Sequence, residues 1–162
     1  MFRKLLVTSF LIVLAIIMGC TDQEGQTDTM APRFSLQDIN DKTVTLAQYK
    51  GSVVILEFWA TWCPPCRASV PGLESLHKRY KDKGLVVLAV SVDEGGWDGV
   101  RSFMAEQGIT YIVLKGTQDV TIKYQIRSIP ATLILNKEGR IAKRYLGQSS
   151  EEELEKDVRS LL

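Results

Sequence analysis

Residues 53–67 read Val-Val-Ile-Leu-Glu-Phe-Trp-Ala-Thr-Trp-Cys-Pro-Pro-Cys-Arg, and this stretch decides the fold. Its first half, 53–59, is almost continuously apolar, as is typical of a strand covered on both faces, so we expect a central position in a sheet. Its second half places Cys63 and Cys66 three residues apart, with two prolines between them. Since proline suits the first positions of a helix, the stretch predicts a strand that leads into a helix with a dithiol at its start.

The Cys-x-x-Cys pattern alone serves zinc binding, haem attachment and disulfide exchange alike. Haem attachment needs a histidine after the second cysteine, where this chain has Arg67. Zinc needs a second pair of ligands, and the only histidine is His77, which we expect to be a solvated helix residue. The sequence therefore predicts no metal and no cofactor, and leaves a redox-active dithiol.

The position of the dithiol predicts a role for each cysteine. Unpaired amides and the positive end of the helix dipole stabilise a thiolate at Cys63, which we expect to be the nucleophile. Cys66 lies one turn further in and is better placed to attack the resulting mixed disulfide. Pro64 and Pro65 have no N–H group, so the Cys66 amide is the chief remaining donor. A thiolate stabilised this moderately favours a reductant.

Outward from this stretch, short β-branched runs alternate with amphipathic segments from 32 to 162, which indicates an α/β domain with one central sheet. Pro71 lies within the first expected helix and predicts a kink there. Ser150 and Glu153 form a capping box that opens the last helix. The expected strands are 34–36 and 43–46, which form a hairpin, then 53–59, 85–92, 109–114, 131–135 and 140–146. The expected helices run from Cys66 towards Gly84, along 100–107, around 120–124, and from 150 to the end.

The amino terminus is typical of an export signal. Arg3 and Lys4 precede an apolar run, 5–18, that is shorter than a membrane-spanning helix. The run closes on Gly19-Cys20 and resembles a bacterial lipobox, which implies that Cys20 is lipidated; a plain signal or signal anchor ending near a cysteine is the alternative. We expect a signal peptide at 1–19, a flexible tether at 20–31 and the domain at 32–162.

Composition and charge exclude several classes. A chain of 162 residues is about one domain long, which excludes a large multidomain enzyme. The sequence has 20 basic residues (Lys and Arg) and 19 acidic residues (Asp and Glu). Loss of Arg3 and Lys4 with the signal would leave 18 basic and 19 acidic residues. This balance gives no reason to expect a nucleic-acid partner.

Two motifs together resemble the thioredoxin fold superfamily: Phe-Trp-Ala-Thr-Trp-Cys-Pro-Pro-Cys at 58–66 and Ser-Ile-Pro-Ala-Thr at 128–132. The added hairpin, the exported start and Asp93-Glu94 after the second core strand are similar to its TlpA/ResA-type subgroup of membrane-tethered thiol-disulfide oxidoreductases. The resemblance implies a thioredoxin-like α/β fold, a central mixed sheet flanked by helices with an added N-terminal β-hairpin. It also implies an extracytoplasmic, periplasmic-side reductant that often serves cytochrome c maturation.

The same resemblance assigns a client-facing surface. Ile129-Pro130 matches the cis-proline loop that lies beside the active-site sulfur and pairs with extended client backbone; an ordinary trans turn proline is the alternative. Trp62 matches the tryptophan before the dithiol, with simple packing as its alternative. The expected surface consists of Trp62, Pro64, Pro65, Ile129 and Pro130.

Glu57 matches the buried acidic position of thioredoxin, where a carboxylate assists proton transfer at the inner cysteine. In the TlpA/ResA-type subgroup this position is often not acidic, so a satisfied glutamate at a strand end is the alternative. We expect burial to raise the pKa of Glu57.

The leading hypothesis is an exported, lipid-anchored, monomeric reductase of protein disulfides. Its expected partners are disulfide-bearing client proteins and a transmembrane electron donor. A net oxidant of secreted proteins is the alternative within the same chemistry. A peroxiredoxin-like peroxidase is disfavoured by a resolving cysteine only three residues away, and a copper chaperone by the lack of a histidine after His77.

Overall fold

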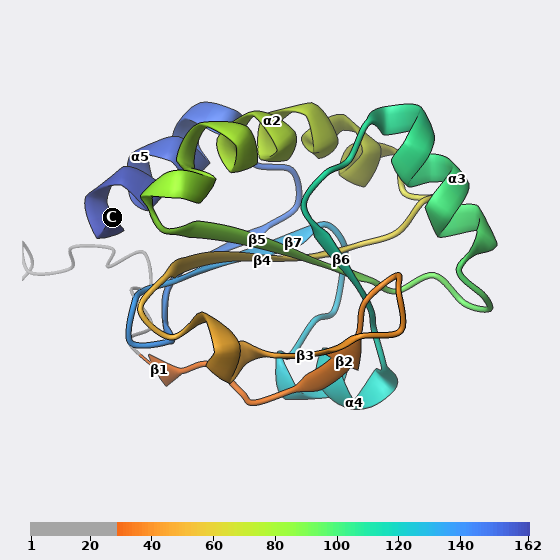
Figure 1. Ribbon diagram of the computed structural model, residues 1–162, viewed down its shortest axis with the longest axis horizontal. Coiled ribbons are helices and arrows are strands. Elements are labelled where there is room, and N and C mark those ends of the chain that lie inside the picture. Colours follow the sequence, from red (N-terminus) through yellow and green to blue (C-terminus); the bar gives the residue numbers. More distant parts are fainter. Residues whose placement is uncertain (1–28) are drawn as a thin grey trace, which may run out of the picture.

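The computed structural model describes residues 29–162, in which a six-stranded sheet forms the middle layer (Figure 1). Its strand order is β1-β8-β7-β4-β5-β6, and β4 runs parallel to β5 but antiparallel to β7, so the sheet is mixed. Every residue of β4 is buried, which confirms the central strand predicted from its apolar run. The strands are β1 (Thr29–Met30), β4 (Val53–Trp59), β5 (Leu85–Ser91), β6 (Ile112–Lys115), β7 (Ala131–Leu135) and β8 (Arg140–Leu146).

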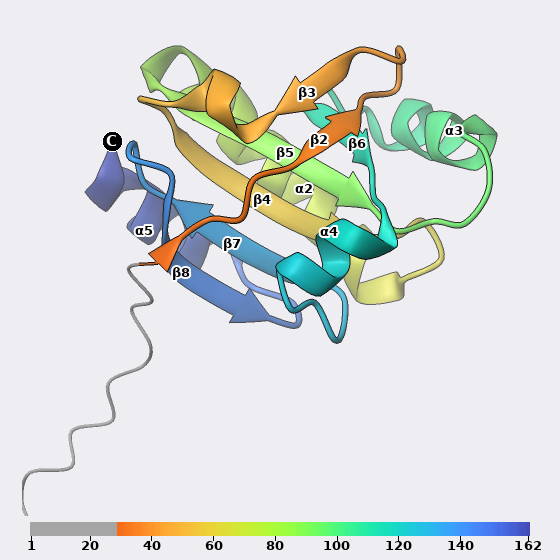
Figure 2. The same cartoon turned by 90° about the horizontal axis from the view of Figure 1, so that it is seen from below.

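Helices and a hairpin cover opposite faces of this sheet (Figures 1 and 2). One face carries α2 (Pro64–Tyr80), α3 (Asp98–Gln107) and α5 (Glu151–Leu161). The other carries the antiparallel hairpin of β2 (Ser35–Gln37) and β3 (Thr43–Thr45), together with α4 (Gln118–Lys123). Short 3-10 helices follow β3 and α2, at η2 (Leu46–Tyr49) and η3 (Lys81–Lys83).

The alternation of side chains along β4 decides which core each residue joins. Ile55 and Trp59 pack in the cluster beneath α2, whereas Leu56 and Phe58 pack in the cluster on the hairpin side. Since successive side chains of a strand point to opposite faces, Glu57 lies on the α2 side. This is also the side that holds both cysteines.

Most of the predicted helices and strands are confirmed, with one late strand start. The helix after the cysteines continues through Pro71 to Tyr80, and the capping box of Ser150 and Glu153 opens α5. The strand expected from residue 109 begins only at Ile112. Its backbone is engaged elsewhere, because the Glu74 carboxylate on α2 accepts hydrogen bonds from the Thr110 N–H at 2.9 Å and hydroxyl at 2.5 Å.

The predicted tether is too long at its carboxyl end. Thr29 and Met30 pair with Ile141 and Arg140 of β8, and Ala31 is buried. An edge strand of two residues needs only backbone hydrogen bonds, so the polar composition of 21–31 gave no sign of it. The signal peptide, Cys20 and the rest of the tether lie outside the described residues. Within residues 29–162, no helix has the length and apolar character required to cross a membrane.

Candidate active site

The two cysteines lie at the start of α2 and form a disulfide, with their Cα atoms 5.3 Å apart. Both are buried, and Cys63 is the N-cap residue, with extended backbone. The Cys66 N–H donates to Cys63 Sγ at 3.4 Å, whereas Pro64 and Pro65 occupy the first helical positions without an amide hydrogen. The Cys66 amide is thus the donor at this sulfur, as predicted.

A turn joins β4 to α2 and presents a tryptophan beside the dithiol. The Cys63 N–H donates to the Ala60 carbonyl at 3.2 Å, which closes the turn around Thr61 and Trp62. The Trp62 side chain is 66% exposed, which excludes the packing role considered for it. Pro64 and Pro65 are also exposed, so these three residues form one accessible surface next to a buried disulfide.

The peptide bond between Ile129 and Pro130 is cis, which excludes the trans turn. Pro130 is buried and its carbonyl accepts from the Gly147 N–H at 2.9 Å. The next residue, Ala131, pairs with Phe58 near the end of β4. The proline loop, at the start of β7, therefore lies at the same end of the sheet as the turn that follows β4 and leads to the cysteines.

Glu57 is the buried carboxyl group of this site. Glu57 is 3% exposed, and its Oε1 has no hydrogen-bond partner among the described residues, which argues against a satisfied glutamate at a strand end. Burial raises the pKa of Glu57 to about 8. The pKa of Tyr111 is raised by burial and, to a smaller extent, by the charge of Glu57. A carboxyl with this pKa can donate and accept a proton near neutral pH.

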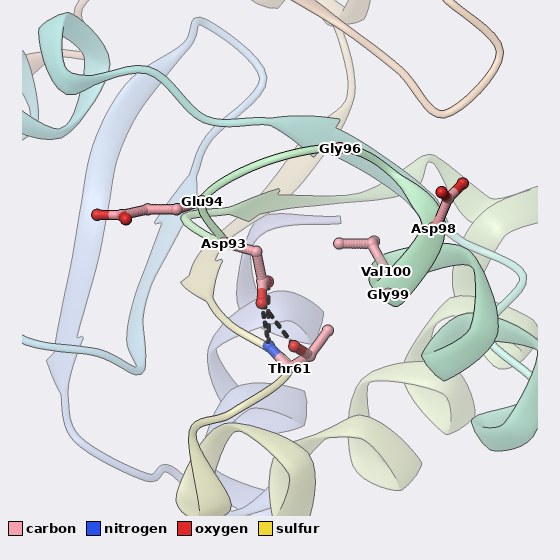
Figure 3. A pocket seen from close by; sticks show the side chains of 7 residues that line it. All are labelled: Thr61, Asp93, Glu94, Gly96, Asp98, Gly99 and Val100. Carbon is pink, nitrogen blue, oxygen red and sulfur yellow. Dashed lines mark hydrogen bonds between the residues drawn. The ribbon is translucent and has the colours of Figure 1, made fainter.

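The structure also places one group at the site that the sequence reasoning missed. Asp93 follows β5, and its carboxylate accepts hydrogen bonds from the backbone and hydroxyl of Thr61 (Figure 3). Both residues border an open cavity of about 360 Å³, which Glu94 and Asp98 also line. The available signal was an acidic residue directly after a strand expected to lie beside β4.

The prediction of a solvated His77 is wrong. His77 is only half-exposed, its Nδ1 is buried without a partner, and its ring lies edge-on to Tyr111 with 6.3 Å between centroids. Burial lowers the pKa of His77. The prediction relied on the charged neighbours Lys78 and Arg79, which are exposed, whereas His77 lies on a different side of the helix. Residues 29–162 hold no group of three or more His, Cys, Asp or Glu side chains arranged for a metal.

Comparisons with known proteins agree with this geometry. The Redoxin family model matches residues 24–162. Thioredoxin-like protein YneN of Bacillus subtilis (strain 168) is 38% identical over 138 residues, which cover 84% of this chain and 79% of that protein. Thiol-disulfide oxidoreductase ResA of the same strain is 32% identical over 159 residues, covering 92% and 88%.

A solved structure supports the same assignment. A thiol:disulfide interchange protein of the thioredoxin family from Chlorobium tepidum superposes with a TM-score of 0.73 at 28% identity, covering 83% of this chain and 96% of that one. The fold is therefore thioredoxin-like, with additional strands at the amino terminus. The chain belongs to the Redoxin family and is a thiol-disulfide oxidoreductase of the ResA type.

Proposed function

We propose that this protein is an extracytoplasmic reductant of protein disulfides. The observation that carries the proposal is the hydrogen bonding of Cys63 Sγ, to which only the Cys66 N–H donates among the described residues, at 3.4 Å. The two prolines that follow Cys63 remove two further amides from this helix terminus. A less stabilised thiolate makes the Cys63–Cys66 disulfide less oxidising, so the dithiol is the better electron donor.

The reaction begins with the reduced dithiol. The Cys63 thiolate attacks one sulfur of a client disulfide; the client S–S bond breaks and its second sulfur leaves as a thiolate. Cys66 then attacks Cys63 Sγ in the mixed disulfide, and the first client sulfur leaves. The client gains two electrons as two thiols, and Cys63 and Cys66 lose two as they form the disulfide seen in the structure.

Glu57 accepts the proton that Cys66 releases in the second step. The Cys66 thiol must lose its proton before it attacks, and Cys66 is 1% exposed, so bulk water has little access to it. Glu57 lies on the same side of the sheet and, when ionised, takes this proton. With a pKa of about 8 it is close to the ordinary pKa of a thiol, so proton transfer in either direction costs little. When a donor reduces the protein again, protonated Glu57 returns the proton to Cys66.

The client surface comprises exposed Trp62, Pro64 and Pro65 with the Ile129-Pro130 loop at the same edge of the sheet. Extended client backbone pairs with this loop, as the resemblance to the TlpA/ResA-type proteins implies. Apocytochrome c is a candidate client on the same ground. The protein acts as a monomer and receives electrons from a transmembrane donor.

The location follows from the amino-terminal sequence. The apolar run 5–18 directs export, and lipid on Cys20 holds the domain at the membrane. Electrons must then be supplied across the membrane, because an extracytoplasmic compartment otherwise oxidises exposed dithiols.

The reduction potential tests the direction of the reaction. Equilibration with glutathione or dithiothreitol buffers, followed through tryptophan fluorescence, should give a value nearer thioredoxin at about −270 mV than DsbA at about −120 mV. The difference is easily resolved, since about 30 mV changes the equilibrium tenfold for two electrons. A potential near that of DsbA would reject the reductant and favour the oxidant of secreted proteins.

A further inference from the structure

Four hydrogen bonds link the Asp93 carboxylate to its surroundings, all from uncharged donors. The Thr61 N–H lies 3.2 Å from Oδ1 and 3.0 Å from Oδ2, and the Thr61 hydroxyl donates to Oδ1 at 2.5 Å. The Ser91 hydroxyl donates to Oδ2 at 2.8 Å. Hydrogen bonds to an ionised acceptor are stronger than those between neutral groups, so this contact holds Thr61 firmly.

The parallel pairing of two strands brings Asp93 to Thr61. Trp59 pairs with Ser91 at the ends of β4 and β5, and the Val92 N–H extends the ladder to the Trp59 carbonyl at 2.8 Å. The side chain of Asp93 then points directly at Thr61, whereas that of Glu94 points away (Figure 3).

The held residue belongs to the turn that carries the active site. Ala60 and Cys63 close this turn, so Thr61 and Trp62 are its two central residues. In addition, Arg67 Nη1 donates to the Thr61 carbonyl at 3.3 Å. Thr61 is therefore held through its N–H, its hydroxyl and its carbonyl. The next residue, Trp62, is 66% exposed, so its direction depends largely on the backbone of the turn.

We propose that Asp93 is a positioning residue for protein clients, which anchors Thr61 and thereby orients the exposed Trp62 beside Cys63. The inference rests on the client-binding role of Trp62 in the proposed function. The hydrogen bonds of the Asp93 carboxylate go to Thr61 and Ser91 rather than to a sulfur, so Asp93 acts on client binding through the turn. Its removal should therefore weaken the use of protein disulfides more than the use of small disulfides, which need only the sulfur of Cys63.

The test compares Asp93→Ala and Asp93→Asn with Glu94→Gln, which removes a neighbouring charge without touching Thr61. Reduced enzyme is assayed in single turnover with increasing concentrations of insulin or of 5,5′-dithiobis(2-nitrobenzoate), so that the dithiol itself supplies the two electrons; kcat and KM here are the limiting rate constant and the half-saturating concentration. Loss of a charged hydrogen-bond acceptor should lower kcat/KM for insulin about tenfold in Asp93→Ala, mainly through KM, with the small disulfide changed less than about twofold. Asp93→Asn keeps one acceptor oxygen, so its kcat/KM for insulin should lie between those of Asp93→Ala and the wild type. Glu94→Gln should have the same kcat/KM as the wild type.

A double-mutant cycle with Trp62→Ala separates positioning from a purely structural role. If Asp93 acts through Trp62, then Asp93→Ala should cause little further rise in KM once Trp62 is absent. Additive effects, or equal losses with insulin and the small disulfide, would overturn the proposal. Should Asp93→Ala fail to fold, Thr61→Val removes the hydroxyl from the other side of the contact and should raise the insulin KM; an unchanged KM there would also overturn it.

The two proposals fail in different ways. A wild-type protein that does not reduce insulin would count against the reductant. The Asp93 variants would then be compared in the oxidation of a reduced cysteine peptide by the oxidised protein. In this reaction too, the effect of Asp93→Ala on KM is expected to depend on Trp62.

Discussion

Replacement of Glu57 by glutamine should make the oxidised protein more stable at neutral pH and remove most of a pH dependence. Glu57 loses its proton near pH 4.5 in the unfolded chain but only at about pH 8 in the folded one. Between these values the folded state binds more protons, so the free energy of unfolding falls as the pH rises. Above about pH 8 Glu57 is ionised in both states, so it causes no further fall in the free energy of unfolding.

The magnitude follows from the same two pKa values. One pH unit corresponds to about 1.4 kcal/mol for each proton, so the interval from pH 5 to pH 7 should cost the wild type about 2 to 3 kcal/mol through Glu57. Glutamine has nearly the same shape and does not ionise. The free energy of unfolding of Glu57→Gln, minus that of the wild type, should therefore grow by this amount over the interval.

Urea unfolding of both oxidised proteins at several pH values, followed by tryptophan fluorescence, measures this difference. Glu74→Gln is the matched control on the facing helix. Burial opposes ionisation of Glu74, but hydrogen bonds from Thr110 and the charge of Lys78 outweigh it and lower its pKa. Glu74 is thus ionised in both states from pH 5 to pH 7. The free energy of unfolding of Glu74→Gln, minus that of the wild type, should therefore change little over this interval. Parallel curves for wild type and Glu57→Gln would refute a buried, protonated Glu57.

Three further outcomes are expected. Alkylation against pH should show a lower thiol pKa for Cys63, measured in Cys66→Ala, than for Cys66, measured in Cys63→Ala; a more reactive Cys66 at neutral pH would reverse their roles. Gly116→Ala should destabilise the protein by about 1 to 3 kcal/mol in urea unfolding, because its Cβ would lie 2.5 Å from the Ser91 carbonyl oxygen; unchanged stability would contradict this close approach. Intact-mass measurement of exported protein should find lipid on Cys20 that is absent from Cys20→Ser, and an unmodified start upstream of Cys20 would reject the anchor.

Local sequence determined the parts of this protein that depend on neighbouring residues. The apolar run 53–59 specified a buried strand, and the prolines after Cys63 specified a helix start, because both effects act within a few residues. The capping box of Ser150 and Glu153 likewise opens α5 by contacts three residues apart. The motif at 58–66 further carried the resemblance that implied the thioredoxin-like fold.

Only the tertiary structure decided which polar groups are buried and what they contact. Glu57 acquires its raised pKa from the surrounding core, since no neighbour in sequence can desolvate it. Asp93 meets Thr61 across 32 residues and Glu74 meets Thr110 across 36, because strand pairing and helix packing bring them together. Thr29 joins the sheet through backbone hydrogen bonds, which leave no pattern in the side chains. Such contacts depend on distances between elements, and periodicity along the chain carries no information about them.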